Sequence, residues 1–290
     1  MSRSSRGRTA LGTLVAIATM ACGAAPPLEQ LSQARDLSAD LLVQFVSAAD
    51  ASNKVIMADT NEAAAAFARD AQSAKQTVQT DITSLKPLLS DLGYAPETDL
   101  LRTFASCLDQ YRELDTQALA LADENTNRRA QRLSFGPALA EADGFRDAVN
   151  SLAAGSAANT WQVKALAATA VAAVREMQAL QAPHIAEAGD TAMTAMEQRM
   201  ASAQRTATSA LQALAPVVSV TSRSQLDAAN AALNRFVSIH TQITELSRRN
   251  SNVRSLALSL NEKGKVTREC EDSLRALRDA LAARGFKATR

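Results

Sequence analysis

The sequence predicts an all-α protein, and its composition and an internal repeat are the two observations that predict it. Apolar residues make up 47% of the 290 residues and aromatic residues only 3%, while 10 glycines and 7 prolines leave few places for turns. This composition favours long helices packed through small side chains over a β-sheet, which is rich in valine, isoleucine, tyrosine and phenylalanine.

One stretch of the chain occurs twice, which indicates a duplicated unit. The first copy begins at Phe104 and the second at Phe236, and both keep the spacing Phe-x-Ser-x3-Gln-x2-Glu-Leu. The second copy then reaches its asparagine, Asn250, seven residues sooner than the first copy reaches Asn125. Seven residues are about two helical turns, so the same helical face is kept.

The first residues predict an exported, membrane-anchored protein. Residues 1–21 hold three arginines and an apolar stretch too short to span a bilayer, and a small residue precedes Cys22. The pattern resembles a bacterial lipoprotein signal peptide, with Cys22 as the lipidated residue and 22–27 as a tether; ordinary secretion and a retained anchor are the alternatives. Without residues 1–21 the chain has 28 basic and 30 acidic residues, a net charge of −2, which excludes nucleic-acid binding.

The helical region, residues 28–290, begins with two long segments in which apolar residues recur at helical spacing. The first spans about 28–92 and has a polar interruption at 59–61. After a turn at 93–96, the second segment spans about 100–152 and has the most regular apolar seam, with a break or kink at Gly136 and Pro137.

Two further segments repeat this plan. The third spans about 160–214 and changes phase between Pro183 and Gly189, and the fourth spans about 224–283 with an interruption at 261–265. Repeat 1 (about 28–152) and repeat 2 (about 160–285) are therefore each one αα-hairpin, and two hairpins bury their seams as an antiparallel four-helix bundle. We favour a continuous rod of about 90 Å, given a rise of ~1.5 Å per residue. Two shorter bundles stacked end to end are the alternative, if the interruptions are corners.

The continuous bundle makes three further predictions. The chain start, the connection at 153–160 and the C-terminus share the membrane end. Cys107 and Cys270 lie on parallel helices, tens of ångströms apart, and remain free thiols because a disulfide needs Cα atoms within about 7 Å. Trp161 either caps the core or faces the lipid head groups.

One level of the expected bundle is polar. Four segments fall about 30 residues from the far end of the bundle: 59–61, 125–129, 183–184 and 250–254. One interpretation is a register device, in which buried asparagines fix the alignment of the helices. The other is a pocket for a small anion, in which arginines form a fork and amides complete it. Its candidate residues are Asn125, Arg128, Arg132, His184, Asn250 and Arg254.

Other site classes find no support in the sequence. No nucleophile and base form a catalytic constellation, and neither His184 nor His240 has an evident orienting acid. The two histidines are also far apart in the chain, without carboxylates at ligand spacing, so we expect no metal and no cofactor. Arg248 and Arg249 are interpreted as solvated charge. The sequence therefore predicts a protein that is not an enzyme.

The segments Glu-Asn-Thr-Asn-x-x-Ala-x-x-Leu-Ser at 124–134 and Asn-Ser-Asn-Val-Arg-Ser-Leu-Ala-Leu-Ser at 250–259 resemble the four-helix-bundle sensory module of bacterial methyl-accepting chemotaxis receptors. The resemblance covers about 30–285. It implies an extracytoplasmic bundle that dimerises and senses small molecules or partner proteins. The chain departs from a full receptor in having no second membrane span, no linker domain and no signalling hairpin.

Three functions follow as expectations. The first is a non-enzymatic, lipid-anchored bundle on the periplasmic face of a bacterial membrane, which binds a small anion or an envelope protein. The second is a structural lipoprotein that acts as a spacer in the envelope. The third is a membrane-active helical protein that acts through residues 148–174, the least charged part of the chain after residue 21.

Overall fold

The computed structural model describes residues 27–58, 60–155 and 160–285, and helices account for nearly all of these ranges, with no strand among them. The α-helices are α1 (Pro27–Met57), α2 (Asn61–Asp91), α3 (Ala95–Glu124), α4 (Thr126–Leu133), α5 (Leu139–Ala154), α6 (Thr160–Ala186), α7 (Asp190–Leu214), α8 (Arg223–Arg249), α9 (Ser251–Leu258) and α10 (Gly264–Ala283). The shorter turns are two π-turns, η1 (Ser134–Ala138) and η3 (Ser259–Lys263), and one 3₁₀ turn, η2 (Val220–Ser222). The expected all-α class is confirmed.

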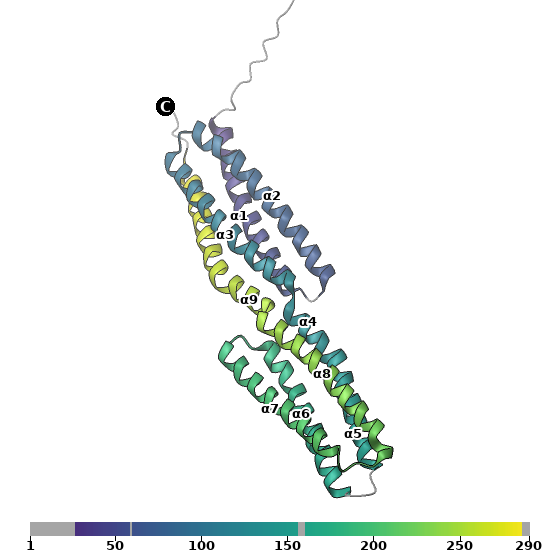
Figure 1. The fold of residues 1–290 in the computed structure, drawn as a ribbon. Helices are drawn as coiled ribbons and strands as arrows, with labels where there is room; N and C mark the ends of the chain where they lie inside the picture. Colours follow the sequence, from purple (N-terminus) through teal and green to yellow (C-terminus); the bar gives the residue numbers. More distant parts are fainter. Residues whose placement is uncertain (1–26, 59, 156–159, 286–290) are drawn as a thin grey trace, which may run out of the picture.

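Two four-helix bundles are stacked end to end (Figure 1). The first bundle consists of α1, α2, α3 and α10, and the second of α5, α6, α7 and α8. Each bundle has its own apolar core, built around Phe45 and Phe104 in the first and around Phe145 and Phe236 in the second. Of the two arrangements that the sequence leaves open, the molecule adopts the stacked bundles and not the continuous rod.

Two helical columns join the bundles. Helices α3, α4 and α5 follow one another in the first column, and α8, α9 and α10 run in the opposite direction in the second (Figure 1). Each column leaves the bundle of its own repeat and supplies the fourth helix of the other bundle, because α5 packs against α6 and α8 while α10 packs against α1 and α3. The two repeats thus exchange their last helices, and each bundle contains residues of both.

The expected first helix, residues 28–92, folds back on itself as the antiparallel pair α1 and α2 (Figure 1). Thr60 caps α2 by accepting a hydrogen bond from Ala63 N at 3.1 Å. The expected third helix, residues 160–214, reverses in the same way before α7, where Gly189 has an extended conformation. Both interruptions in the sequence are therefore full reversals, which a loop of two to five residues between antiparallel helices provides.

These reversals change which segments share an end of the molecule. The start of α1, the α2–α3 turn and the end of α10 lie together, where Arg35 Nε donates to Leu281 O at 2.9 Å and Arg284 Nε donates to Glu97 Oε1 at 2.7 Å. The α5–α6 connection and the α7–α8 turn lie at the opposite end (Figure 1). The expectation that the chain start and the 153–160 connection share an end is therefore wrong.

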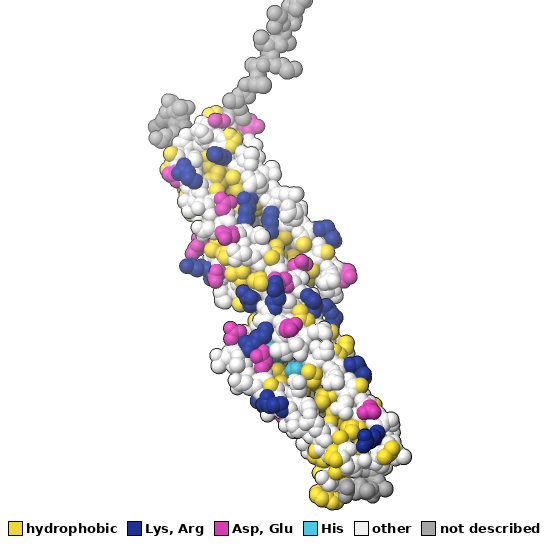
Figure 2. All heavy atoms as spheres, in the orientation of Figure 1, with side chains coloured by type: hydrophobic (Ala, Val, Ile, Leu, Met, Phe, Trp, Pro, Cys, Tyr) yellow, Lys and Arg dark blue, Asp and Glu magenta, His cyan; other side chains and the backbone are white. Residues whose placement is uncertain are grey.

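Trp161, in the first turn of α6, is 78% exposed, so it does not cap the core. It lies at the end opposite the start of α1, so it does not face the membrane beside the tether as expected. Residues 206–222, which reach the same end, contain no charged side chain, and apolar side chains gather there on the face drawn in Figure 2. In the described ranges, no helix combines the length and the apolar character that crossing a bilayer requires.

Cys107 on α3 and Cys270 on α10 form a disulfide, with an Sγ–Sγ distance of 2.05 Å and a Cα–Cα distance of 5.5 Å. The expected pair of free thiols is therefore wrong. The reason is chain direction, because α3 and α10 are antiparallel and not parallel (Figure 1). Cys107 lies twelve residues after the start of α3 and Cys270 thirteen residues before the end of α10, so both reach the same level of the first bundle.

Candidate ligand site at the junction of the two bundles

Each column breaks at an asparagine where the two bundles meet. Asn125 separates α3 from α4 and Asn250 separates α8 from α9, and both have φ of 52°, in the left-handed region. Asparagine tolerates this region better than other side chains because its short amide makes local hydrogen bonds. Among the described residues, these two are the only positions other than glycine with a positive φ.

The helices that begin after these breaks cap each other. Thr126 N donates to Ser251 Oγ at 3.1 Å, and Ser251 N donates to Thr126 Oγ1 at 3.0 Å. One residue further, Asn127 N donates to Asn252 Oδ1 and Asn252 N donates to Asn127 Oδ1, both at 3.1 Å. The first N–H groups of a helix have no partner within it, so each helix here satisfies those of the other. The junction is thus built from equivalent residues of both repeats.

Side-chain amides extend this junction into both bundles. The Asn127 amide donates to Asn250 Oδ1 and to Ile185 O, each at 2.7 Å, and the Asn250 amide donates to Glu187 O at 2.8 Å. Asn127 and Asn250 are 6% and 5% exposed, so these bonds are made away from water. They tie the end of α6 to the breaks in both columns.

We expect Asn250→Ala to lower the free energy of unfolding by about 2 kcal/mol. Alanine pays about 1–2 kcal/mol to adopt the left-handed conformation, and each lost hydrogen bond costs about 1 kcal/mol. Asn250→Gly is the matched control, because glycine adopts this conformation freely and loses only the hydrogen bonds. Urea unfolding of the three proteins measures the difference. A more stable Asn250→Leu variant would contradict this role and support a seam that prefers an apolar residue.

A pocket of about 280 Å³ lies beside the junction, at the inner end of the first bundle. The end of α1, the start of α2 and the end of α3 form most of its wall, and Arg128 of α4 and Asn252 of α9 close it. Its polar side chains are Asn61, Asp123, Asn125, Arg128 and Asn252. The remaining lining is apolar, as is usual for small-molecule sites in helix bundles.

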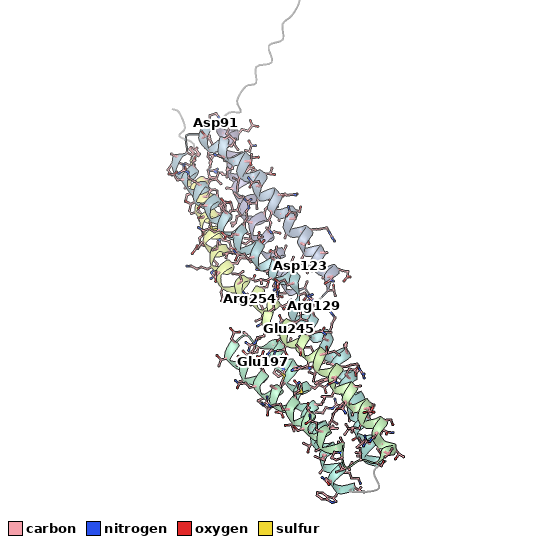
Figure 3. The ribbon with its side chains drawn as sticks, in the orientation of Figure 1. Asp91, Asp123, Arg129, Glu197, Glu245 and Arg254 are labelled. Carbon is pink, nitrogen blue, oxygen red and sulfur yellow. A yellow bond between two sulfur atoms is a disulfide. The ribbon has the colours of Figure 1, made fainter. Side chains whose placement is uncertain are left out.

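The structure brings some of the predicted site residues together and separates others. Asn125 and Arg128 line the pocket, and Arg128 is half-buried and donates to the carbonyl of Ala58. Arg132, one turn further along α4, and Arg254 of α9 are exposed and are not part of the pocket lining. Figure 3 shows Arg254 and Arg129, which occupy equivalent positions in the two repeats, at opposite edges of the junction in this view.

The other two predicted residues, Asn250 and His184, belong to the junction and to the second bundle. His184 is 1% exposed, with Nδ1 2.8 Å from Ser247 Oγ and Nε2 3.0 Å from Glu197 Oε1. The expectation that neither histidine has an orienting acid is therefore wrong for His184. The sequence could not show Glu197 as its partner, because only the reversal between α6 and α7 brings the two together.

Arg248 completes this cluster rather than serving as solvated charge. Its Nε and Nη2 donate to the two carboxylate oxygens of Glu197 at 2.6 and 2.7 Å, and Nη2 also donates to Thr194 Oγ1 at 2.7 Å. The hydrogen bonds from Arg248 lower the pKa of Glu197; partial burial opposes this, and the contact with His184 adds to it. Glu197 thus stays ionised in a paired, fork-like contact.

His240, the second histidine, is also in the second bundle. Its ring stacks on Phe236, with centroids 6.2 Å apart, and Nδ1 lies 3.4 Å from Gln181 Nε2. Burial lowers the pKa of His240 to about 4, and the charge of His184 lowers it further. In the described part of the chain, no group of three or more histidine, cysteine and acidic side chains has the geometry to hold a metal ion.

No protein-family model and no curated protein matches the chain. Among solved structures, it is similar to a chain of the crystal structure of the TorS sensor domain–TorT complex in the presence of TMAO, with a TM-score of 0.36 and 13% identity. The match covers 89% of this chain and 100% of that chain. The partner and the TMAO in that description are those of that complex.

Proposed function

We propose that this protein is a non-enzymatic, extracytoplasmic module of the sensor type that binds a small polar molecule at the junction of its two bundles. The observation behind this proposal is the pocket beside the breaks, which offers a guanidinium, a carboxylate and amides within a largely apolar wall. Helix bundles commonly bind ligands between facing helices. The sequence resemblance to chemoreceptor sensory modules agrees with such a role.

The position of the pocket gives binding a route to the rest of the molecule. Its wall includes Asn125, where the first column breaks, and Asn252, which caps α4 across the junction. A ligand in contact with both favours the arrangement of the columns that it binds best, because a ligand shifts an equilibrium by its difference in affinity for the two states. We infer that the break in the columns is the element that responds to binding.

The proposed location rests on the disulfide. Disulfides persist in oxidising compartments and are rare in the cytosol, so the Cys107–Cys270 bond supports an extracytoplasmic protein. Attachment to a membrane through a lipid on Cys22 belongs to the same proposal, as does dimerisation, and Cys22 lies outside the described residues. Mass spectrometry of the protein from its native membrane tests the lipid directly.

Thermal unfolding of the purified protein with small organic acids, nitrate and amino acids tests the binding function. A ligand at 100 times its Kd adds about 2.7 kcal/mol, which raises the Tm by roughly 5–10 °C for a chain of this size. We expect Arg128→Ala to remove the rise, because Arg128 is the one cation in the pocket lining. Arg132→Ala, one turn further along α4, is the matched control and should keep it.

Two results would contradict the proposal. One is that no compound raises the Tm while Arg128→Leu and Asn125→Leu are both more stable than the wild type. The polar layer would then act only as a register device, and the spacer function would be favoured. The other is that Arg132→Ala abolishes the rise as completely as Arg128→Ala, which would place binding outside the pocket.

A further inference from the structure

The junction pocket has a counterpart in the second bundle, because the local structure is duplicated there. Helices α1 and α6 end 129 residues apart, and α2 and α7 also start 129 residues apart. Helices α3 and α8 end 125 residues apart, and the same separation relates α4 to α9 and η1 to η3. Every residue that lines the pocket therefore has an equivalent in the other half of the molecule.

The hydrogen bonds support this correspondence. Ala58 and Glu187 are equivalent positions, and the backbone carbonyl of each accepts a bond from a junction side chain. The donor is Arg128 in the first bundle and Asn250 in the second. The contacts of Asn127 with Asn252 likewise occur in both directions with equal lengths. The two halves can therefore be compared position by position.

The counterpart of the pocket is filled by the protein's own side chains. Met193 and His184, both 1% exposed, occupy the positions of Ala64 and Val55. The carboxylate of Glu197 occupies the position at which the first bundle has Ala68. The pocket therefore exists because large side chains of the second repeat are replaced by small ones in the first. Figure 3 labels Asp123 and Glu197 on either side of the junction.

The charges differ as well as the volumes. In the second bundle, Glu197 on α7 is paired with Arg248 on α8. In the first bundle, Asp123 is the equivalent of Arg248, so the charge at the end of the helix is reversed, and Ala68 supplies no partner for it. Arg128 is the equivalent of Val253 and adds a positive charge to the pocket lining. The pocket thus has one charge of each sign and lacks the built-in group of its counterpart.

We propose that the pocket binds a small zwitterion, whose cationic group pairs with Asp123 and whose anionic group pairs with Arg128. This inference rests on the proposed binding function and names the class of its ligand. The amides of Asn125 and Asn252 line the same space and provide further donors and acceptors. The bound ligand takes the place that Glu197 fills in the second bundle, so the first site is open and the second is closed by its own chain.

Isothermal titration with three matched probes tests this proposal: γ-aminobutyrate as the zwitterion, butyrate as the anion and butylamine as the cation. We expect γ-aminobutyrate to bind at least about tenfold more tightly than the other two, the effect of about 1.4 kcal/mol for one additional ion pair. Asp123→Asn should remove this advantage and leave the affinity for butyrate unchanged. Asp123 is exposed and lies outside both cores, so this variant is expected to fold normally.

A second variant tests the filled counterpart as the explanation. Ala68→Glu introduces the side chain that fills the second bundle, and we expect it to abolish binding of γ-aminobutyrate. Ala65→Glu, exposed on the same helix and outside the pocket lining, is the control that should bind normally. Butyrate or butylamine binding as tightly as γ-aminobutyrate would overturn the zwitterion and leave the proposed function intact. If none of the three probes binds and the acid and nitrate panel has no effect, the proposed function fails and the inference fails with it.

Discussion

Reduction of the Cys107–Cys270 disulfide is expected to lower the free energy of unfolding by about 3–5 kcal/mol. The bond closes a loop with a sequence separation of 163 residues, and the stabilisation by a disulfide grows with the length of the loop it closes. It also joins α3 to α10, the helix that the first bundle receives from the other repeat. Once reduced, α10 is held to that bundle by its packing and by surface ion pairs alone.

Guanidinium unfolding of the oxidised and reduced protein measures this loss. The Cys107→Ala/Cys270→Ala variant should match the reduced wild type and show no response to reductant, which separates the disulfide from other effects of the reagent. We also expect the first bundle to unfold before the second in the reduced protein, because the second has no cross-link among its described residues. Equal unfolding midpoints with and without reductant would contradict the prediction.

The sequence predicts the helical class and the positions of the breaks, but not the direction of the chain after each break. Helical periodicity shows where a helix is interrupted, and the interruption at 59–61 looks the same whether the chain bends or reverses. The reversal between α1 and α2 makes α3 antiparallel to α10, and the disulfide and the position of Trp161 both follow from it. These errors therefore have one cause.

The polar level of the junction was predicted correctly despite this error. The expectation counted about 30 residues from turns assumed to share one end. The α2–α3 and α7–α8 turns in fact lie at opposite ends, and the breaks at Asn125 and Asn250 are each about one bundle length from their own turn. Both topologies therefore place the two asparagines at the same height. The reciprocal caps between Thr126 and Ser251 depend on this coincidence of levels.

Residues that follow a π-turn were harder to predict. A π-turn holds one residue more than an α-turn, so it shifts the phase of the helix and moves the buried face by about 100°. The interruption expected at 261–265 proves to contain such a turn, η3, which ends at Lys263. The shift places Lys263 in the core of the first bundle at 1% exposure. A periodicity of 3.6 residues carried through this segment would not have placed it there.

Asp115→Leu is expected to destabilise the protein by about 3–5 kcal/mol. Asp115 is 2% exposed and accepts hydrogen bonds from Lys263 Nζ at 3.0 Å, from Lys75 Nζ at 2.5 Å and from the Ser52 hydroxyl. Its loss leaves the ammonium of Lys263 buried without a carboxylate, and desolvation already lowers the pKa of that lysine while Asp115 opposes the shift. Asp109→Leu, on the exposed face of α3, should change stability by less than about 0.5 kcal/mol.

The acid dependence of stability provides a second readout of the same pair. Burial raises the pKa of Asp115, but the charges and hydrogen bonds of Lys263, Lys75 and Ser52 more than offset it, so the folded pKa lies below 3.8. A carboxyl group with a depressed pKa stabilises the fold above its unfolded pKa, and this contribution is lost as the pH falls through the folded value. We therefore expect the wild type to lose stability below pH 3.8 more steeply than Asp115→Leu.

The Asp115→Leu/Lys263→Met double variant separates the value of the pair from the cost of breaking it. Replacing both buried charges with apolar side chains is often neutral or stabilising, so most of the stability lost in Asp115→Leu should return. Urea unfolding of the wild type, both single variants and the double variant forms a double-mutant cycle that measures the coupling. A double variant as unstable as Asp115→Leu would show that Lys75 and Ser52, rather than Lys263, are the partners that depend on this carboxylate.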